Sequence, residues 1–364
     1  MQGHTAENQK KHEIMKRFSI SVFYTALVLM FAAGCAKEVK SGPNDASKRY
    51  IDAWIHVYNT NHGTDIQPTR LGAYVLEETK GDGAEITDNG YAIVEYKGTD
   101  LEGNITQFTS ADIARQLGTY DTTRYYGPEV WLTKEGTIPA GVQESLVGMK
   151  VGGSIKLMVP SWLMTYSVYA TAEEYLNQET ESSDMIYEFT VKDFTDSIDV
   201  WQTDNINSYI EENYGSLDSF KNDTVGFYYR QIEAPSDSKT FTKDAKVYIN
   251  YTGKLLNGLV FDTTIEKVAK DNGLYNASRT YEPVLINWGE NYRDLTMGTD
   301  ATTIISGFAR TLWQMKNEEK GIGIFNSTFG YGYNGSGSSI PSYAPLIFEI
   351  EIVTSEDSDE SIDD

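Results

Sequence analysis

The chain has 364 residues, of which 53 are acidic and 30 basic, so its formal net charge is −23. Nucleic-acid binding needs basic surface to neutralise phosphates, so we expect no nucleic-acid partner. A single cysteine, Cys35, excludes an intramolecular disulfide. All four histidines lie at or before His62, so a histidine triad or multi-histidine metal site is excluded beyond that residue.

Residues 1–34 read as an export signal rather than as part of a fold. Lys16 and Arg17 precede an apolar run over 18–33, and small residues lead directly into Cys35. This order resembles the lipobox of bacterial lipoproteins, although Ala32 stands where leucine is usual. The resemblance implies a diacylated Cys35 as the first mature residue. We therefore expect a protein of the bacterial cell envelope, outside the cytoplasm and held to a membrane by lipid.

Two alternatives to lipidation stay open at this end of the chain: a signal that is cleaved without lipidation, and an uncleaved anchor. The apolar run has about 16 residues, short of the roughly 20 that a helix needs to cross a bilayer, which disfavours the anchor. Residues 35–46 are polar and are predicted to form a tether. At the other end, residues 355–364 carry acids and no base, which indicates a solvated tail.

Between these ends lies a weak internal repeat, in residues 47–196 and 226–354. In both copies, bulky and polar residues alternate with the period of two that is typical of half-buried strands. The expected elements of the first copy are a helix over 47–59 and strands over 72–78, 91–98, 154–160 and 185–191. Those of the second copy are strands over 226–232, 246–253, 321–325 and 346–353, and a helix over 304–315.

This order predicts an α+β fold of two domains, each with an antiparallel sheet packed on a short helix. Residues 197–225 are predicted to be a linker with a helix over 204–213. The strand-rich reading agrees with an aromatic content of 12%, which includes 25 tyrosines.

Four stretches of the second copy resemble, in order, the pattern of FKBP-type peptidyl-prolyl isomerases. They read INYTG at 249–253, VFDTT at 260–264, IISGF at 304–308, and TFGYG at 328–332 followed by Ile340-Pro341 and LIFEI at 346–350. No single stretch is specific, and the order and spacing of the set carry the resemblance.

The resemblance implies that residues 226–354 form an FKBP-type domain, which isomerises Xaa–Pro bonds of polypeptides without metal, cofactor or covalent intermediate. It gives donor or orienting roles to Tyr251, Asp262, Ile305 (through its backbone N–H) and Tyr331. It places the proline ring in a pocket formed by Phe261, Val284, Ile304, Phe308, Ile340 and Phe348. Phe308 stands where tryptophan is common and Val284 where an aromatic residue is common. Residues 265–281 and 290–302 read as insertions.

Residues 47–196 resemble the same pattern less closely and are predicted to be a degenerate FKBP-like domain. The pocket positions fall on Tyr96, Phe108, Ile138, Val142 and Tyr187. Thr109 is expected to replace the aspartate. Pro139 takes the position of the backbone donor, although proline has no N–H. We therefore expect this copy to isomerise poorly or not at all.

Rotation about an Xaa–Pro bond crosses a barrier of ~18–20 kcal/mol because it breaks amide resonance. A twisted amide is less polar than a planar one, so an apolar pocket with a donor for the preceding carbonyl favours it. The leading hypothesis is a lipid-anchored isomerase that assists the folding of exported proteins. Two alternatives stay open: a non-catalytic module that binds proline-containing or unfolded segments, and a structural subunit of the envelope.

Overall fold

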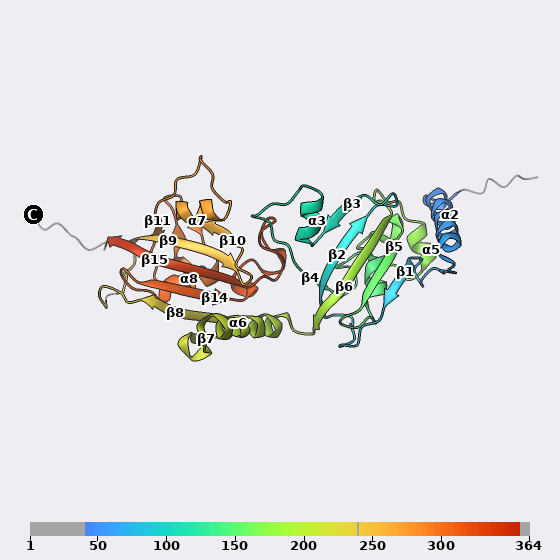
Figure 1. Ribbon diagram of the computed structural model, residues 1–364. Coiled ribbons are helices and arrows are strands. Elements are labelled where there is room, and N and C mark those ends of the chain that lie inside the picture. The colour runs from blue at the N-terminus through green and yellow to red at the C-terminus, as the bar shows by residue number, and fades with distance from the viewer. Residues whose placement is uncertain (1–40, 239, 357–364) are drawn as a thin grey trace, which may run out of the picture.

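The computed structural model describes residues 41–238 and 240–356, which form two α+β domains (Figure 1). No helix within these residues is long and apolar enough to cross a membrane. The predicted export signal, Cys35, most of the tether and the acidic tail beyond residue 356 lie outside the described residues.

The first domain is a six-stranded antiparallel sheet with helices around it. Its strands run in the order β1 (Tyr74–Thr79), β5 (Ser154–Val159), β6 (Met185–Thr195), β2 (Tyr91–Thr99) and β3 (Ile105–Phe108), and β4 (Glu129–Leu132) also pairs with β2. Its helices are α2 (Asp45–His62), α3 (Ala111–Gln116), α4 (Ala140–Leu146) and α5 (Ala172–Leu176), with a 3-10 turn η1 (Ser161–Leu163). Val142 and Leu146 of α4 and Ile51 of α2 join one core with the strands.

The second domain has a nine-stranded antiparallel sheet. Eight strands follow the order β13 (Thr302–Thr303), β12 (Thr296–Met297), β11 (Val284–Asn287), β9 (Lys246–Leu255), β15 (Leu346–Glu356), β14 (Lys320–Phe325), β8 (Phe227–Glu233) and β7 (Lys221–Thr224), and β10 (Val260–Thr263) pairs with β9. Helix α7 (Glu266–Asp271) follows β10, and the 3-10 turns are η2 (Leu217–Ser219), η3 (Tyr292–Asp294), η4 (Ser327–Phe329) and η5 (Gly332–Asn334).

Helix α8 (Ser306–Gln314) packs closely on this sheet because two glycines permit it. A Cβ added at Gly307 would lie 2.4 Å from ring atoms of Phe325 on β14. A Cβ at Gly323 of β14 would lie 1.9 Å from the hydroxyl oxygen of Thr311 on α8. Such approaches exclude any side chain, so both positions require glycine. The close packing brings Phe308 of α8 into the core beneath the sheet.

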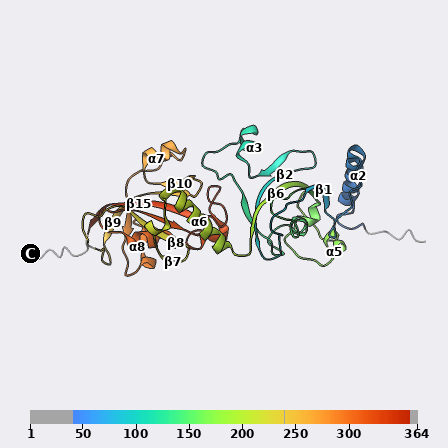
Figure 2. The same ribbon diagram turned by 60° about the horizontal axis from the view of Figure 1, so that its bottom comes forward.

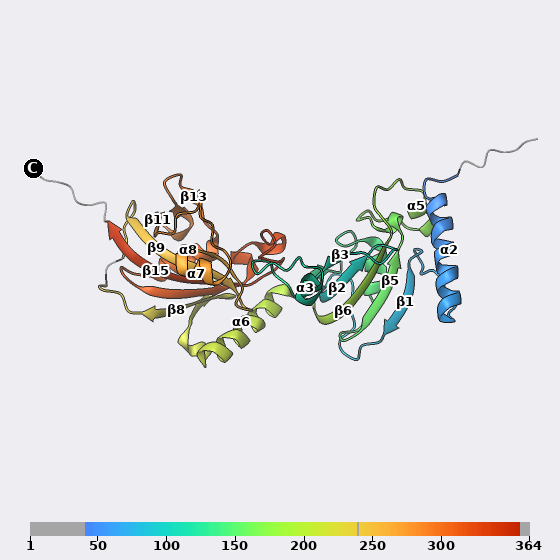
Figure 3. The same ribbon diagram turned by 45° about the horizontal axis from the view of Figure 1, so that its top comes forward.

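Helix α6 (Ile198–Tyr214) belongs to the second domain and lies along its sheet (Figures 1 and 3). Ile206 and Ile210 are buried in one cluster with residues of β8, β14 and β15. The buried Gln202 side chain donates to the Ser327 hydroxyl at 3.0 Å and accepts from the Ser327 N–H at 2.6 Å. The helix expected at 204–213 is therefore longer than expected, and it packs on the domain that follows it.

The two domains share one topology, as the repeat predicted. The path β1-β5-β6-β2-β3 of the first domain corresponds to β8-β14-β15-β9-β10 of the second, and β4 corresponds to β11. The domains lie end to end rather than stacked (Figure 2). The loop between η4 and β15, seen in dark red in Figure 1, reaches from the second domain toward β4 of the first.

Candidate active site

A cavity of about 470 Å³ opens in the second domain between α8, strands β9, β10 and β15, and the loop that follows η4. We call residues 331–343 of this loop the flap. The cavity is lined by Tyr251, Phe261, Asp262, Met297, Thr302, Thr303, Ile304, Ile305, Phe308, Tyr331, Ser336, Ser339, Ile340 and Phe348. These residues come from separate parts of the chain that only the folded sheet brings together.

The floor of the cavity is aromatic and rigid. Phe308 packs edge-to-face against Phe348, with ring centroids 4.9 Å apart, and against Tyr251 at 5.3 Å. Phe261 meets Phe348 in the same manner at 5.6 Å. Gly253 lies beneath these rings, where an added Cβ would lie 2.5 Å from Phe261. Edge-to-face packing stabilises each ring in place, so the floor is preformed for a flat apolar group.

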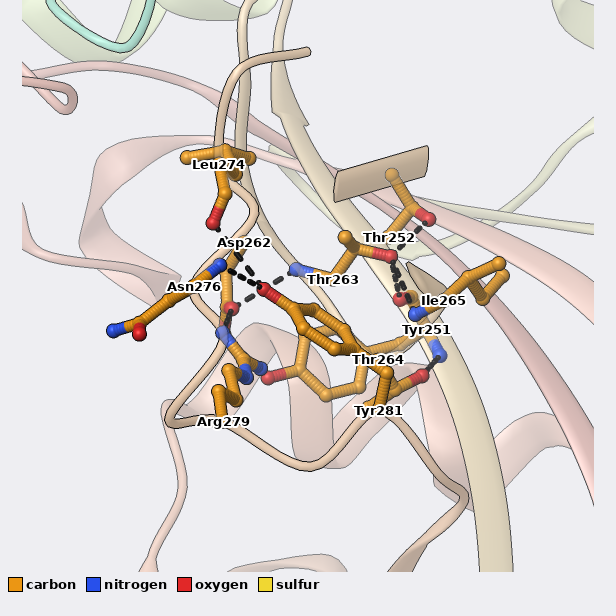
Figure 4. A network of polar contacts seen from close by, with 10 residues as sticks. All are labelled: Tyr251, Thr252, Asp262, Thr263, Thr264, Ile265, Leu274, Asn276, Arg279 and Tyr281. Carbon is orange, nitrogen blue, oxygen red and sulfur yellow. Dashed lines mark hydrogen bonds and ion pairs between the residues drawn. The ribbon is translucent and has the colours of Figure 1, made fainter. Parts of the chain in front are cut away.

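One wall of the cavity is polar and is organised around Asp262 (Figure 4). The Tyr251 hydroxyl donates to one carboxylate oxygen of Asp262. Arg279 donates to the other at 2.6 Å, and so does the Thr263 N–H at 2.9 Å. With donors on both oxygens, this carboxylate is held in one orientation.

Burial raises the pKa of Tyr251, and the neighbouring charge of Asp262 raises it further, so the hydroxyl stays a neutral donor at pH 7. Burial also raises the pKa of Tyr331, with a smaller contribution from Asp262. Tyr331 is 37% exposed, and among the described residues its hydroxyl has no hydrogen-bond partner. It is therefore a donor that remains available to a ligand.

A second available donor lies at the start of α8. Ile305 is the N-cap residue of that helix. Within the described part of the chain its backbone N–H donates to no other group. Helix starts leave such N–H groups without intrahelical partners, and the helix dipole strengthens them as donors. The cavity thus combines an aromatic floor with two donors that the protein itself does not use.

The structure brings nine of the ten predicted site residues to this cavity. Val284 is the tenth: it lies half-buried on β11 beside the core and is not among the lining residues. Met297, Thr302, Thr303, Ser336 and Ser339 also line the cavity and were not identified from the sequence. Within residues 41–238 and 240–356, no group of three or more His, Cys, Asp or Glu side chains is arranged to hold a metal ion.

Arg279 was missed because residues 265–281 were interpreted as an insertion, and no site residue was sought in it. The stretch contains α7 and a loop that recurs in the first domain. Tyr275 stacks on Tyr281 with centroids 5.6 Å apart, and in the first domain Tyr120 stacks on Tyr126 at 5.4 Å. The signal in the sequence was the repeated pattern of Gly, Tyr, Arg and Tyr at 118–126 and 273–281.

Strand register also corrects the reading of the first pocket. Gly253 on β9 pairs with Asp262, and its counterpart Gly98 on β2 pairs with Gln107. Gln107, rather than Thr109, therefore stands at the position of the aspartate. Thr109 corresponds to Thr264, because each hydroxyl accepts from the backbone N–H of the sheet tyrosine, at 3.0 and 2.9 Å.

The same register also corrects the prediction that Phe108 occupies a pocket position. Phe108 pairs with Lys97 as Thr263 pairs with Thr252, so it does not stand at the pocket position of Phe261. Pro139 is placed as expected. It is the N-cap residue of α4, as Ile305 is of α8, and it has no N–H to offer.

Comparison with known proteins agrees with this geometry. Residues 237–353 match the model of the family described as FKBP-type peptidyl-prolyl cis-trans isomerase. The second domain belongs to this family. The FKBP-type domain is 28% identical over 128 residues to a Haemophilus influenzae protein named "Probable FKBP-type peptidyl-prolyl cis-trans isomerase", covering 35% of this chain and 42% of that protein.

Two further relatives differ in how much of them is covered. The chain is 24% identical over 132 residues to the macrophage infectivity potentiator of Trypanosoma cruzi, covering 36% of this chain and 54% of that protein. It is 28% identical over 115 residues to an FK506-binding protein of Neisseria meningitidis, covering 32% of this chain and 84% of that protein. The match thus spans about half the length of the Haemophilus and Trypanosoma proteins.

Solved structures of the same family also align with this chain. The three FKBP domains of wheat FKBP73 align with a TM-score of 0.28 at 15% identity, covering 81% of this chain and 100% of that one. FkpA from Escherichia coli aligns with a TM-score of 0.30 at 20% identity, covering 44% of this chain and 63% of that one.

Proposed function

We propose that the FKBP-type domain catalyses cis–trans isomerisation of Xaa–Pro bonds in polypeptides. The observation that carries this proposal is the pairing of the aromatic floor with two unused donors, the Ile305 N–H and the Tyr331 hydroxyl. The family of the domain supports the same activity. No covalent step is needed, because the reaction is a rotation about one bond.

In this mechanism the proline ring lies on Phe308, between Phe261 and Phe348. A donor at Ile305 or Tyr331 holds the carbonyl that precedes proline while the C-terminal side of the peptide turns. The twisted amide is less polar than the planar one, so the apolar floor stabilises it relative to the ground state. Interactions that are stronger in the transition state than in the ground state are the ones that accelerate the reaction.

Asp262 has a positioning role in this account. It is bonded to Tyr251 and ion-paired with Arg279, so it fixes the wall against which the peptide turns. It accepts hydrogen bonds from three donors of the protein. Asp262 therefore shapes the site by holding Tyr251 and Arg279 in place.

The test is the exchange of a short, uncharged Xaa–Pro peptide in the presence of the protein from residue 36 onward. We expect catalysed exchange at micromolar protein. A folded protein that binds the peptide without accelerating its exchange would contradict isomerisation and would favour the binding module.

We also propose that lipid on Cys35 holds the protein to a membrane outside the cytoplasm and that its substrates are exported polypeptides. The support is the order of basic residues, apolar run, small residues and cysteine over residues 16–35. The structure describes residues 41–46 of the predicted tether, and residues 45–46 already belong to α2, so the tether is two residues shorter than predicted. An anchored isomerase of this kind acts on chains that emerge at the membrane.

A further inference from the structure

The flap of the FKBP-type domain borders two cavities. Tyr331 and Ile340 line the isomerase cavity. Tyr333, Ser342 and Tyr343 line a second cavity of about 630 Å³ in the first domain. Figures 1 and 3 show the loop that carries the flap at the border between the domains, facing β4 and α3. A ligand in either cavity therefore contacts the same short segment.

The flap is held on the first domain by specific contacts. The Tyr125 N–H donates to the Ser338 carbonyl at 2.9 Å. Tyr343 packs edge-on against Tyr91 of β2, with centroids 5.4 Å apart. Tyr343 has a φ of +59°, and its N–H donates to the Gly332 carbonyl at 2.8 Å, which closes the flap on itself. A non-glycine residue in this conformation is kept there by its surroundings.

The second cavity occupies, in the first domain, the position of the isomerase cavity. Tyr96 on β2 corresponds to Tyr251, and Ile138, Pro139 and Val142 lie at the start of α4 as Ile304, Ile305 and Phe308 lie at the start of α8. Its walls are rich in aromatic rings. Tyr96 lies 5.1 Å from Trp131 and 6.3 Å from Tyr187, centroid to centroid.

A carboxylate lies among these rings. Glu129 on β4 pairs with Val94, as Val284 on β11 pairs with Ile249, so the acid stands where the isomerase domain has valine. Glu129 lines the second cavity together with Tyr96 and Trp131. Burial raises the pKa of Glu129, which means that its charge is poorly solvated.

The isomerase domain supplies a cation for its carboxylate, and the first domain does not. Arg279 lies 2.6 Å from Asp262. Its counterpart Arg124 lies over the rings of Phe108, at 5.6 Å, and Tyr126, at 5.5 Å. Arg124 acts on Glu129 only through longer-range attraction, and among the described residues Glu129 has no ion-pair partner.

Glu129 is half-buried. A charge that is partly withdrawn from water is costly unless it is paired, and aromatic faces attract cations. We propose that the first-domain cavity is a second polypeptide-binding site that receives a Lys or Arg side chain of an extended segment at Glu129. Pro139 offers no N–H there, so the site binds without isomerising. Because the flap borders both cavities, occupancy of this site changes turnover in the FKBP-type domain. The coupling, but not the binding, rests on the proposed isomerase function.

Two proline-free peptides that differ only in one central Arg or Gln test the binding. We expect the full protein to bind the Arg peptide at least about tenfold more tightly, which is about 1.4 kcal/mol. The variant Glu129→Gln should lose this preference. The matched variant Glu95→Gln removes the same charge from β2, where Glu95 pairs with Lys192 outside the cavity, and should keep it. Equal loss in both variants would overturn the proposal and indicate attraction to the net charge alone.

A second measurement tests the same binding site on the wild-type protein, so it does not require that a variant folds. A Lys peptide treated with a carbodiimide forms an amide with a carboxylate that it contacts, and mass spectrometry locates the bond. We expect the bond at Glu129, and a wild-type protein labelled only elsewhere would overturn the site.

A third measurement tests the coupling between the first-domain cavity and turnover in the FKBP-type domain. Saturating Arg peptide should change turnover of a neutral Xaa–Pro peptide in the wild type and not in Glu129→Gln, and an unchanged rate in both would overturn the coupling. If the wild type shows no turnover at all, the proposed isomerase function fails while the binding result stands.

Discussion

Tyr251 and Tyr96 occupy the same position in the two domains, and each shares its cavity with a carboxylate that comes from a different strand. Tyr251 donates to Asp262 on β10, whereas burial and the charge of Glu129 on β4 raise the pKa of Tyr96. Only the first of these carboxylates has an arginine paired with it. The two copies have thus kept a carboxylate in the cavity of this tyrosine and changed what surrounds it.

The first prediction concerns the Arg279–Asp262 pair. Asp262→Asn keeps the shape of the side chain and removes its charge, and Arg279→Met removes the other partner. Both should lower turnover of an Xaa–Pro peptide, because the cavity wall loses its fixed orientation. Both side chains are more than a third exposed, so the cost in stability should stay within about 1 kcal/mol.

Thermal unfolding and peptide exchange, measured on the same samples, separate the two effects. Lys48→Met breaks a comparable exposed pair on α2, with Asp52, and serves as the control. If the Arg279 and Asp262 variants kept full turnover, the positioning role of Asp262 would be refuted.

The second prediction is that the activity resides in the second domain. The fragment 197–354 keeps α6, whose buried residues join the core of that domain, and should be active. The fragment 47–196 should be inactive because Pro139 has no N–H at the start of α4. Peptide exchange with each purified fragment checks this, after circular dichroism has shown that both are folded. Equal activity in the two would contradict our reading of the first pocket.

The third prediction concerns alkaline stability. Burial and the neighbouring Asp52 raise the pKa of Tyr74 to about 12. The folded state therefore favours the neutral phenol, so its contribution is complete below the ordinary pKa of about 10 and is lost as the pH rises from there toward 12. The free energy of unfolding of the first domain, measured with denaturant, should therefore fall over that window. In Tyr74→Phe it should fall less steeply. An identical slope in the variant would show that this phenol is not responsible.

The fourth prediction is that Cys35 carries lipid. Fatty-acid label should enter the wild-type protein in bacteria and should be absent from Cys35→Ser, which should appear as a soluble protein or an uncleaved precursor. Label that persists in Cys35→Ser would exclude lipidation at this residue.

Much of this fold was predictable because several of its strands alternate apolar and polar side chains. Residues 348–352 alternate in this way and form part of β15, with Phe348 at the cavity as expected. The position of Gln107 was not predictable. It depends on the register of β3 against β2, which shifts at a bulge between Gly98 and Thr99. A shift of this kind moves side chains to other positions without leaving a mark in the sequence.

The contacts of the flap with the first domain also could not be predicted from the sequence. Tyr343 meets Tyr91 across more than half the length of the chain, and no local pattern specifies that pairing. Arg279 was different, because its loop is repeated in the first domain and a search for that repeat identifies it.

The central claim is that the cavity at Phe308 is an isomerase site with Tyr331 as a donor, and Tyr331→Phe tests it most directly. This variant keeps the ring and removes one hydroxyl, so the fold should be unchanged by circular dichroism. Loss of a donor that acts in the transition state should cost on the order of 1–3 kcal/mol, seen as a lower kcat/KM on an Xaa–Pro peptide. Tyr50→Phe, on the exposed face of α2, is the matched control and should turn over as the wild type does. A folded Tyr331→Phe protein with the kcat/KM of the wild type would contradict the account.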